Sequence, residues 1–298
     1  MPRVAVAIPA YNAAETVGAA IESVLGQTFR DFSLTVVDDG STDETASITR
    51  GRGPAVGLIE VTRGGVSAAR NRGIAASDSE FVAFLDADDL WEPHKLERQV
   101  RALEQRPEAG LCFTAITRVD KDLRPFAVTP AQERDDFCRD LLLYSSVVPS
   151  SPSTALIRRE VFEAVGGFDQ RFSQCADWDM LLRLSLRTAF VAVDQPLVRY
   201  RQAPGNMSSH IDLLERDTFA VLDAFYDADP PGRYLPLKPR VYSNHWMILA
   251  GSYLHQRQLG RAVRCLGRAL ATDPSNLRRP AGLPLRWARR ARTRSRLS

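Results

Sequence analysis

Three polar clusters in the N-terminal third of the chain combine side chains that could bind a cation and a polyphosphate. Each directly follows a short apolar run, and the clusters are residues 9–12 (PAYN), 38–43 (DDGSTD) and 86–89 (DADD). Packing needs none of these carboxylates, and their mutual repulsion is costly unless a cation or a hydrogen-bond donor relieves it. Mg²⁺ and Mn²⁺ take oxygen ligands, often one or two carboxylates together with substrate phosphates. Asp86 and Asp88 have the Asp-x-Asp (DxD) spacing that suits such an ion, because alternate residues of an extended chain project to one side. Alone, this pair could equally cap a loop; three clusters in this order favour a ligand site.

The elements that would position these clusters alternate between strand and helix. Apolar runs of strand length occur at 4–8, 33–37, 56–61 and 81–85, and helical periodicity occurs at 14–25 and 92–105, where Pro93 suits a first turn. This alternation predicts an α/β fold with a largely parallel sheet and helices on both faces. Ligands bind such sheets beyond the carboxyl ends of the strands, which is where the three clusters would converge.

The remaining chain predicts a mixed region and then a helical extension. Strand patterns at 110–114 and 153–157 alternate with helical patterns near 159–165 and 178–186, whereas the chain from 211 onward is helical in pattern. We expect a catalytic domain over 1–210, with a nucleotide-binding half (1–110) and an acceptor half (111–210), followed by an extension over 211–298.

Within the extension, residues 243–276 have the spacing of small and large residues found in a tetratricopeptide (TPR)-type helical hairpin. One such unit cannot bury its apolar face alone, since arrays need about three. The hairpin is therefore expected to dock onto the catalytic domain or onto a second subunit, as in a homodimer. A dedicated protein-binding module is the alternative.

Charge and composition bear on the cellular compartment of the protein. Residues 277–298 contain eight arginines and no acid, although the net charge of the chain is only +3. This basic tail, with Trp287, could lie on an anionic membrane surface, and a solvated tail is the alternative. The chain has four widely spaced cysteines, no apolar run near the ~20 residues of a membrane helix and no leader pattern. These features predict a cytoplasmic protein. If the basic tail binds lipid, the protein would also make peripheral contact with the inner face of the membrane.

A series of motifs resembles family 2 glycosyltransferases of the GT-A fold. The matching segments are 4–12, 34–43 (LTVVDDGSTD), 65–73 (GVSAARNRG), 81–89 (FVAFLDADD), 166–169 (GGFD), 176–179 (ADWD) and 200–201 (YR). The resemblance covers roughly residues 2–208. It implies an inverting, metal-dependent hexosyltransferase that moves a sugar from a nucleotide-sugar, preferably a UDP-sugar, to an acceptor hydroxyl. A surface glycan or its lipid-linked precursor is the implied acceptor, as in polysaccharide biosynthesis for the cell envelope.

The same resemblance assigns roles to individual residues by matching position. The nucleotide-sugar site would comprise Pro9, Ala10, Tyr11, Glu15, Asp39, Arg70, Asp86, Ala87 and Asp88. Asp39 would accept a hydrogen bond from the base, and Asp88, with Asp86, would bind the Mn²⁺ or Mg²⁺ that holds the diphosphate. Arg70 would lie near the base and the diphosphate, because its guanidinium suits phosphate. A structural ion pair of Arg70 with Asp38 or Asp39 is the alternative.

Asp177 matches the aspartate that this family uses as general base, and two neighbouring departures put details in doubt. Ala176 stands where relatives usually have glutamate, and Ala203 where many have a histidine that assists the metal or the diphosphate. Asp177 could also cap the helix that begins at Trp178 without losing the role of base. Asp179 is the alternative base.

Other function classes find less support in the sequence. There is no Walker loop and no GxGxxG spacing, which argues against a dinucleotide cofactor, and nothing indicates a nucleic-acid partner. A nucleotidyltransferase would usually have a glycine- and basic-rich loop after the first strand, where this chain has AYNAA at 10–14. A non-catalytic nucleotide-binding scaffold that acts through its helices is the remaining alternative. The donor, acceptor, linkage and oligomeric state stay open.

Overall fold

The computed structural model describes residues 1–144, 151–202, 210–228 and 230–275. These residues group into two compact units that divide after residue 203, with residues 139–145 joining the second unit. Ala203, the end of the predicted hairpin at 276 and the basic tail at 277–298 lie outside the described residues. The predicted division of the chain after residue 210 stays a prediction.

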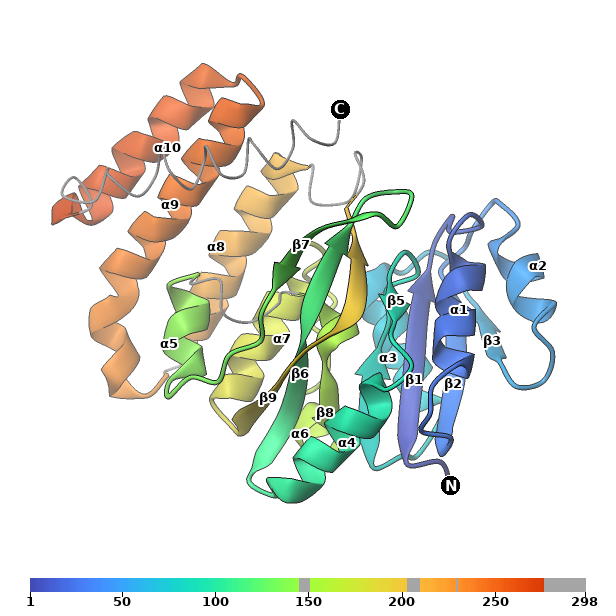
Figure 1. Ribbon diagram of the computed structural model, residues 1–298. Helices are drawn as coiled ribbons and strands as arrows, with labels where there is room; N and C mark the ends of the chain where they lie inside the picture. The colour runs from blue at the N-terminus through green and yellow to red at the C-terminus, as the bar shows by residue number, and fades with distance from the viewer. Residues whose placement is uncertain (145–150, 203–209, 229, 276–298) are drawn as a thin grey trace. The chain divides into compact units, whose positions relative to one another are not determined.

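The first unit contains a nine-stranded sheet whose N-terminal half is parallel (Figure 1). β1 (Val4–Ala10) lies between β2 (Phe32–Asp38) and β4 (Phe81–Phe84), and β3 (Gly57–Glu60) pairs with β2 at the edge. Every residue of β1 is buried, which explains its unbroken apolar sequence. The prediction of a mostly parallel α/β sheet flanked by helices is confirmed.

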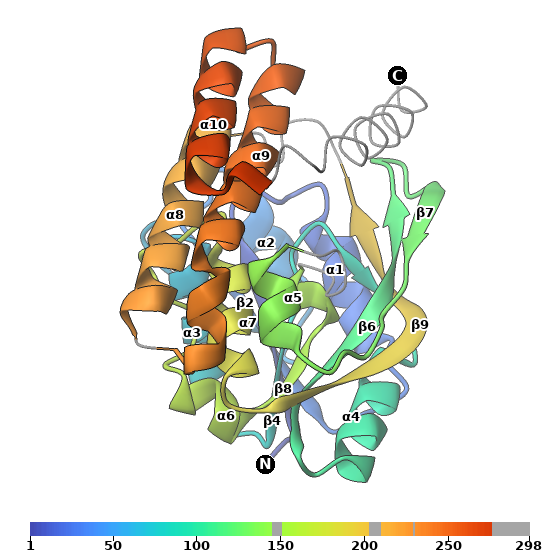
Figure 2. The same ribbon diagram turned by 90° about the vertical axis from the view of Figure 1, so that its left-hand side faces the viewer.

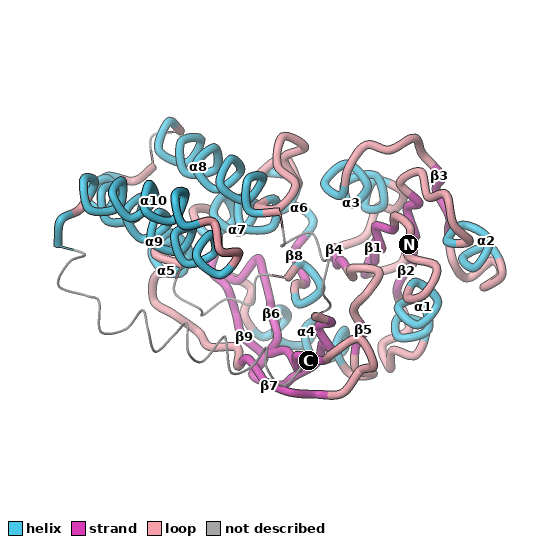
Figure 3. Tube along the Cα trace, turned by 90° about the horizontal axis from the view of Figure 1, so that it is seen from above, coloured by secondary structure: helices cyan, strands magenta, loops and turns pink. Residues whose placement is uncertain are grey.

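Helices cover both faces of this parallel half (Figure 3). α1 (Val17–Leu25) lies on one face with α2 (Thr45–Arg50) beside it, and α3 (Val66–Ala75) lies on the other. α3 approaches β1 closely because residue 73 is glycine: a Cβ there would lie 2.6 Å from the Cβ of Ala7. The predicted helix at 14–25 begins only at Val17, since residues 13–16 form a turn.

The second half of the sheet is mixed in direction. β8 (Leu156–Arg158) pairs antiparallel with β4 and with β6 (Ala109–Val119), and β6 pairs in parallel with the long β9 (Ala189–Arg201). Two short antiparallel strands complete the sheet: β5 (Leu90–Trp91) beside β9 and β7 (Pro125–Thr129) beside β6. α4 (Lys95–Gln105) packs against β6 and β9.

Two boundaries in this half correct the sequence-based prediction. The strand expected at 153–157 is instead a short 3-10 turn, Pro152–Thr154, followed by β8, because the Ser151 hydroxyl accepts from the amide of Ser153 and starts a helical turn. Pro93 precedes α4 rather than lying in its first turn. Two helices, α6 (Arg159–Ala164) and α7 (Ala176–Ser185), follow β8 along the chain.

The second unit is helical throughout the part of it that the structure describes (Figure 2). α8 (Ile211–Asp227) leads through the 3-10 segment Gly232–Leu237 to α9 (Lys238–His255) and α10 (Leu259–Thr272), while α5 (Phe137–Leu142) spans the junction between the units. α9 and α10 form a hairpin whose small residues Ala262, Cys265 and Ala269 face α9 in a shared core. None of the described helices is long and apolar enough to cross a membrane.

Candidate active site

The register of the parallel strands brings the three predicted polar clusters to one edge of the sheet. Ala10 pairs with Asp38 across β1 and β2, and Ala7 pairs with Phe84 across β1 and β4. The amide of Asp39 donates to the carbonyl of Ala10 at 2.8 Å, which continues the pairing beyond the strand. The carboxyl ends of β1, β2 and β4 are therefore adjacent, as expected for a ligand site.

Asp39 is buried and fixes the loop that leads into α3. Its Oδ1 accepts from the amide of Gly64 at 2.7 Å, and its Oδ2 accepts from the amide of Gly65 at 2.8 Å. Gly65 has φ +90, which only glycine adopts without strain. Each carboxylate oxygen keeps a lone pair, so Asp39 can still accept a hydrogen bond from a ligand.

Tyr11 is an exposed residue just after β1, and its partner, Arg63, was not predicted from the sequence. The Tyr11 side chain is 40% exposed, and the guanidinium of Arg63 lies 4.0 Å from its ring centroid and donates to its hydroxyl at 3.0 Å. Glu15 is exposed in the turn before α1, whereas Pro9 and Ala10 are buried within β1. The only signal for Arg63 in the sequence was its place directly before two glycines.

Arg70 is a buried cation of α3 that reaches the acidic loop after β4. Its Nη2 donates to Asp86 Oδ1 at 2.6 Å, and its guanidinium lies 4.9 Å from the ring centroid of Phe168. The predicted alternative, an ion pair with Asp38 or Asp39, is wrong: the partner is Asp86. Among the described residues, nothing accepts from the buried Nε of Arg70, which leaves this donor unsatisfied.

Asp89 anchors the acidic loop, residues 86–89, to neighbouring parts of the sheet. Its Oδ2 accepts from the hydroxyl of Ser153 at 2.7 Å, and its Oδ1 accepts from the amide of Arg201 at 3.0 Å. The Ser153 hydroxyl also accepts from the amide of Asp86. These bonds tie residues 86–89 to the turn before β8, which the sequence did not place at the site, and to the end of β9, which the motif at 200–201 had already associated with it.

Asp88 is a partly exposed carboxylate within this loop. Burial, and then the charge of Asp86, raise the pKa of Asp88 to about 6. The charges of Arg201 and Arg70 act in the opposite direction, and Arg201 Nε also donates to the backbone carbonyl of Asp88 at 2.9 Å. The anion at Asp88 is thus destabilised where it stands, and a bound cation would relieve it. Ala87, between the two aspartates, is partly buried against the core.

Asp177 is the second residue of α7 and follows the buried Ala176. Its Oδ1 accepts from the amide of Trp178 at 2.8 Å, an interaction that the positive end of a helix favours. Burial raises the pKa of Asp177 to about 6 against the opposing charge of Arg70. The carboxylate borders a small cavity whose lining includes Phe113 and Met180. Asp177 is partly exposed and otherwise uncommitted to an ion pair among the described residues.

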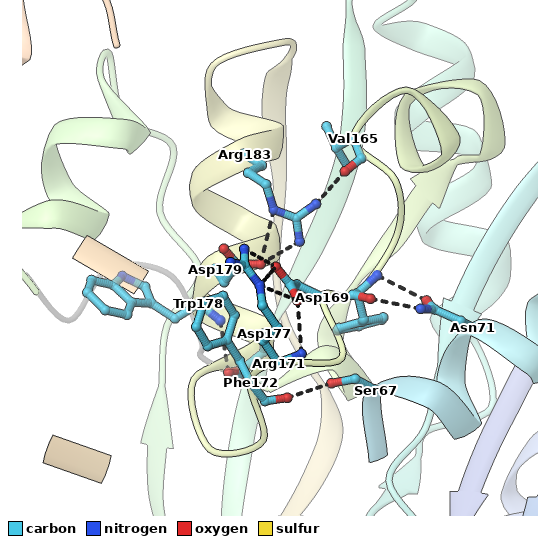
Figure 4. A network of polar contacts seen from close by, with 11 residues as sticks. Ser67, Asn71, Val165, Asp169, Arg171, Phe172, Asp177, Trp178, Asp179 and Arg183 are labelled. Atoms are coloured by element: carbon cyan, nitrogen blue, oxygen red, sulfur yellow. Dashed lines mark hydrogen bonds and ion pairs between the residues drawn. The ribbon is translucent and has the colours of Figure 1, made fainter. Parts of the chain in front are cut away.

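Asp179, the alternative base, has a structural partner (Figure 4). The Nε of Arg183 donates to Asp179 Oδ2 at 3.0 Å, and the same guanidinium donates to the carbonyl of Val165. Asp179 is 5% exposed. This pair ties α7 to the end of α6 and leaves Asp179 poorly placed to accept a proton from a substrate.

The loop between α6 and α7 is fastened to α3, the helix that carries Arg70 (Figure 4). Asn71 donates to the carbonyl of Phe168 at 2.8 Å and accepts from its amide at 3.0 Å. Ser67 donates to the carbonyl of Phe172 at 2.9 Å. The positive φ of Gly166 and Gly167 turns the chain into this loop.

Tyr200 on β9 shows that the carboxylates gather in one place. Its pKa is raised by burial and then by the charges of four aspartates: Asp89, Asp86, Asp88 and Asp177. Among the described residues, no group of three or more His, Cys, Asp or Glu side chains is arranged to hold a metal by itself. A cation here would need ligands from a substrate as well, which is usual for Mg²⁺.

A parallel half-sheet, an acidic loop after β4 and a mixed second half define the GT-A fold of nucleotide-diphospho-sugar transferases. The family model for glycosyl transferase family 2 matches residues 5–166, so the chain belongs to that family and is a glycosyltransferase. The prediction from the motifs is confirmed at this level.

Several curated relatives are glycosyltransferases. The chain is 28% identical over 218 residues to the amylovoran biosynthesis glycosyltransferase AmsB of Erwinia amylovora, covering 69% of this chain and 71% of AmsB. It is 30% identical over 203 residues to an uncharacterized glycosyltransferase of Rickettsia typhi, covering 66% of this chain and 63% of the relative. Chondroitin synthase of Pasteurella multocida is 25% identical over 277 residues, covering 87% of this chain and 28% of the synthase.

Solved structures share the fold at low identity. TarS of S. aureus (residues 1–349), solved in complex with UDP-GlcNAc, superposes with a TM-score of 0.63 at 15% identity over 93% of this chain and 92% of that chain. The mannosyltransferase PcManGT of Pyrobaculum calidifontis, in complex with GDP-Man and Mn²⁺, superposes with a TM-score of 0.63 at 20% identity. The match covers 95% of this chain and 80% of that chain. At these identities the likeness shows the fold.

Proposed function

We propose that this glycosyltransferase moves a sugar from a nucleotide diphosphate to an acceptor hydroxyl with inversion, using Asp177 as general base. The observation that carries the proposal is that the charge of Arg70 acts on two parts of the site. Asp177 on α7 and Asp86 on the acidic loop both interact with Arg70 of α3, so a base and a diphosphate site share one small region.

The donor nucleotide would lie over the carboxyl ends of β1 and β2. Asp39 offers carboxylate lone pairs to a base N–H, and Tyr11 with Arg63 offers a flat surface on which a base can stack. A UDP-sugar is our first choice, supported by the motif resemblance and by TarS, whose structure holds UDP-GlcNAc. GDP-Man in PcManGT makes a GDP-sugar the main competitor.

The acidic loop fits a divalent cation completed by substrate phosphates. Asp88 is a destabilised carboxylate that has no ion pair within the described part of the chain, whereas Asp86 is already paired with Arg70. Asp88 would therefore be the principal protein ligand and Asp86 a secondary one. A bound Mn²⁺ or Mg²⁺ would act as a Lewis acid toward the diphosphate leaving group.

The chain's own residues would supply the remaining steps. Asp177 would accept the proton of the acceptor hydroxyl as that oxygen bonds to the anomeric carbon. The bond from this carbon to the diphosphate oxygen breaks at the same time, and attack from the opposite side inverts the configuration. Arg70, with a buried unpaired Nε, would donate to the departing diphosphate.

The acceptor would belong to the chemistry of surface polysaccharides. AmsB acts in amylovoran biosynthesis and chondroitin synthase makes a polysaccharide, according to their names. Because the aligned region spans only part of each relative, the growing glycan or a lipid-linked precursor is proposed here as a class. The position of the sugar and the linkage are left to experiment.

Donor hydrolysis with and without metal tests this proposal most directly. A panel of UDP-, GDP- and dTDP-sugars would be incubated with the protein in Mn²⁺ or EDTA, because transferases release sugar to water slowly when no acceptor is present. We expect metal-dependent release from one donor class, lost in Asp88→Ala and kept in Asp78→Ala, a matched exposed aspartate outside the site. Equal release in EDTA, or full activity of Asp88→Ala, would refute the metal-dependent mechanism.

A further inference from the structure

α10 contains a seven-residue repeat that its packing does not explain. Leu259-Gly260-Arg261-Ala262 recurs as Leu266-Gly267-Arg268-Ala269. The two alanines of the repeat, together with Cys265, fill the interface with α9. The two leucines do not take part in that core. A seven-residue repeat of large apolar residues is the pattern by which helices pair along a seam.

The leucines of the repeat belong to an exposed apolar stripe. Leu259 is 63% exposed, Val263 67% and Leu266 36%, and Leu270 is partly exposed. Their spacing of four, three and four residues places them within a sector of about 60° on the helix surface. Leu254, 41% exposed at the end of α9, lies next to the same turn in the chain. Soluble proteins rarely leave a continuous apolar strip of this kind uncovered.

The charged residues of α10 lie away from this stripe. Arg261 pairs with Asp212, and Arg264 pairs with Glu215 at 2.9 Å, both on α8, while the guanidinium of Arg268 lies 4.7 Å from the ring centroid of Trp246. By helical geometry these three arginines point about 130–170° from the stripe. Gly260 and Gly267 lie beside the stripe, on the side of α10 that faces away from α9. A Cβ added at either glycine would have nothing within 4 Å among the described residues. A partner helix could therefore approach the stripe closely without meeting the arginines of α10.

We propose that this stripe is an interface between two copies of the chain, in which α10 of one copy packs antiparallel against α10 of the other. The spacing reads the same in both directions, so a two-fold axis would place residue 259 opposite 270 and residue 263 opposite 266. Every apolar side chain then meets another, which is the self-complementarity that an isologous interface requires.

Two further features favour a second copy over other occupants. α8 flanks the α9–α10 hairpin on its arginine side, and a hairpin of this type is stable when both sides are covered. Pairing across the two-fold axis would cover the open side in both copies at once. An anionic lipid surface would require cations beside the stripe, whereas these arginines are turned toward α8 and α9. A seam over residues 259–270 is about 18 Å long, which is short of a standard interface, so the association should be weak and depend on concentration.

Sedimentation velocity of the full chain, over a roughly hundredfold range of concentration, tests the proposal. We expect the mass to rise from 33.1 kDa toward twice that value. The double variant Val263→Glu/Leu266→Glu should stay monomeric, because four carboxylates would meet at the two-fold axis. Val128→Glu, which places the same charge at a 60% exposed valine of β7, should associate like the wild type.

A disulfide trap gives an independent readout. The four natural cysteines are all buried, so Val263→Cys/Leu266→Cys introduces the accessible thiols. Oxidation should yield a covalent dimer, and Val128→Cys should not. A wild type that stays monomeric at every concentration would overturn the proposal, as would association that survives the double glutamate substitution. Binding to anionic vesicles without a dimer would assign the stripe to lipid instead. Neither readout depends on donor turnover, so failure here leaves the proposed reaction untouched.

Discussion

Replacing Asp177 by asparagine separates the proposed base from the binding site around it. Asparagine keeps the size of the side chain and an oxygen that can accept from the Trp178 amide, so α7 should begin as before. It cannot take a proton. Positioned general bases contribute about 10²- to 10⁴-fold, so kcat should fall by that factor, or about 3–5 kcal/mol of barrier, while donor KM changes little.

The pKa of Asp177 predicts the direction in which the transfer rate changes with pH and the pH at which it changes. Asp177 must be deprotonated to act, and burial raises its pKa to about 6. Transfer should therefore rise with pH through about 6, reach a plateau above about 7.5, and fall toward tenfold lower at about pH 5. Asp177→Asn should lose this acidic limb along with the rate. The assay is transfer to a competent acceptor across this range, with donor saturating.

Asp179→Asn is the matched control, because it changes an aspartate two residues away that is paired with Arg183. We expect lower thermal stability from loss of this buried pair and a kcat within tenfold of the wild type, with the acidic limb kept. If Asp179→Asn lost more rate than Asp177→Asn, or if Asp177→Asn kept wild-type kcat, the assignment of the base would be wrong.

Two other substitutions test electrostatic features of the first unit. Arg70→Gln removes the cation that lowers the pKa of Asp177, so the acidic limb of the pH profile should shift upward and donor affinity should fall, as measured by a pH–rate profile and by nucleotide titration. A limb that stays in place would contradict this. Lys95 is fully buried, its Nζ donates to Gln99 Oε1 at 2.7 Å, and burial lowers its pKa to about 7. Since the unfolded chain then binds more protons between about pH 7 and 10, the free energy of unfolding of the wild type, relative to Lys95→Met, should rise with pH by up to ~1.4 kcal/mol per unit, level off above about 10 and be constant below about 7. Urea unfolding of both proteins at about pH 7 and 9 measures this, and a difference that does not change with pH would refute it.

The parallel half of the fold could be predicted because its central strands, β1 and β4, are buried on both faces. β1 and β4 are continuous apolar runs, and the polar clusters after them mark where each strand ends. α3 was not predicted, since its buried residues are mostly small or polar and give no apolar periodicity. β9 was also missed, because its centre contains the exposed residues Asp194, Gln195 and Pro196. Periodicity detects elements that bury large side chains and overlooks those that pack through small ones.

The residues of the candidate site could be named from motifs, but their partners could not. Arg70 lies 31 residues from Asp39 and 16 from Asp86 in the sequence, and only the path of α3 relative to the strands decides that it pairs with Asp86. Asp89 accepts from Ser153 and from the amide of Arg201, which lie 64 and 112 residues away. Such contacts follow from the order of strands in the sheet, which no local pattern contains.

α3 is the element that joins the two halves of the proposed reaction. One face of α3 packs on β1 through Gly73, so the position of α3 is fixed relative to the carboxyl ends of the parallel strands. It also presents Arg70 to the acidic loop and holds the loop before α7 through Asn71 and Ser67. In the proposed site, the distance between the diphosphate and Asp177 is thus set by a single helix rather than by two independent loops. Since a displacement of about 1 Å at a reacting centre can cost on the order of 10²-fold in rate, this arrangement explains why a ten-residue helix with few large apolar residues is held by so many specific contacts.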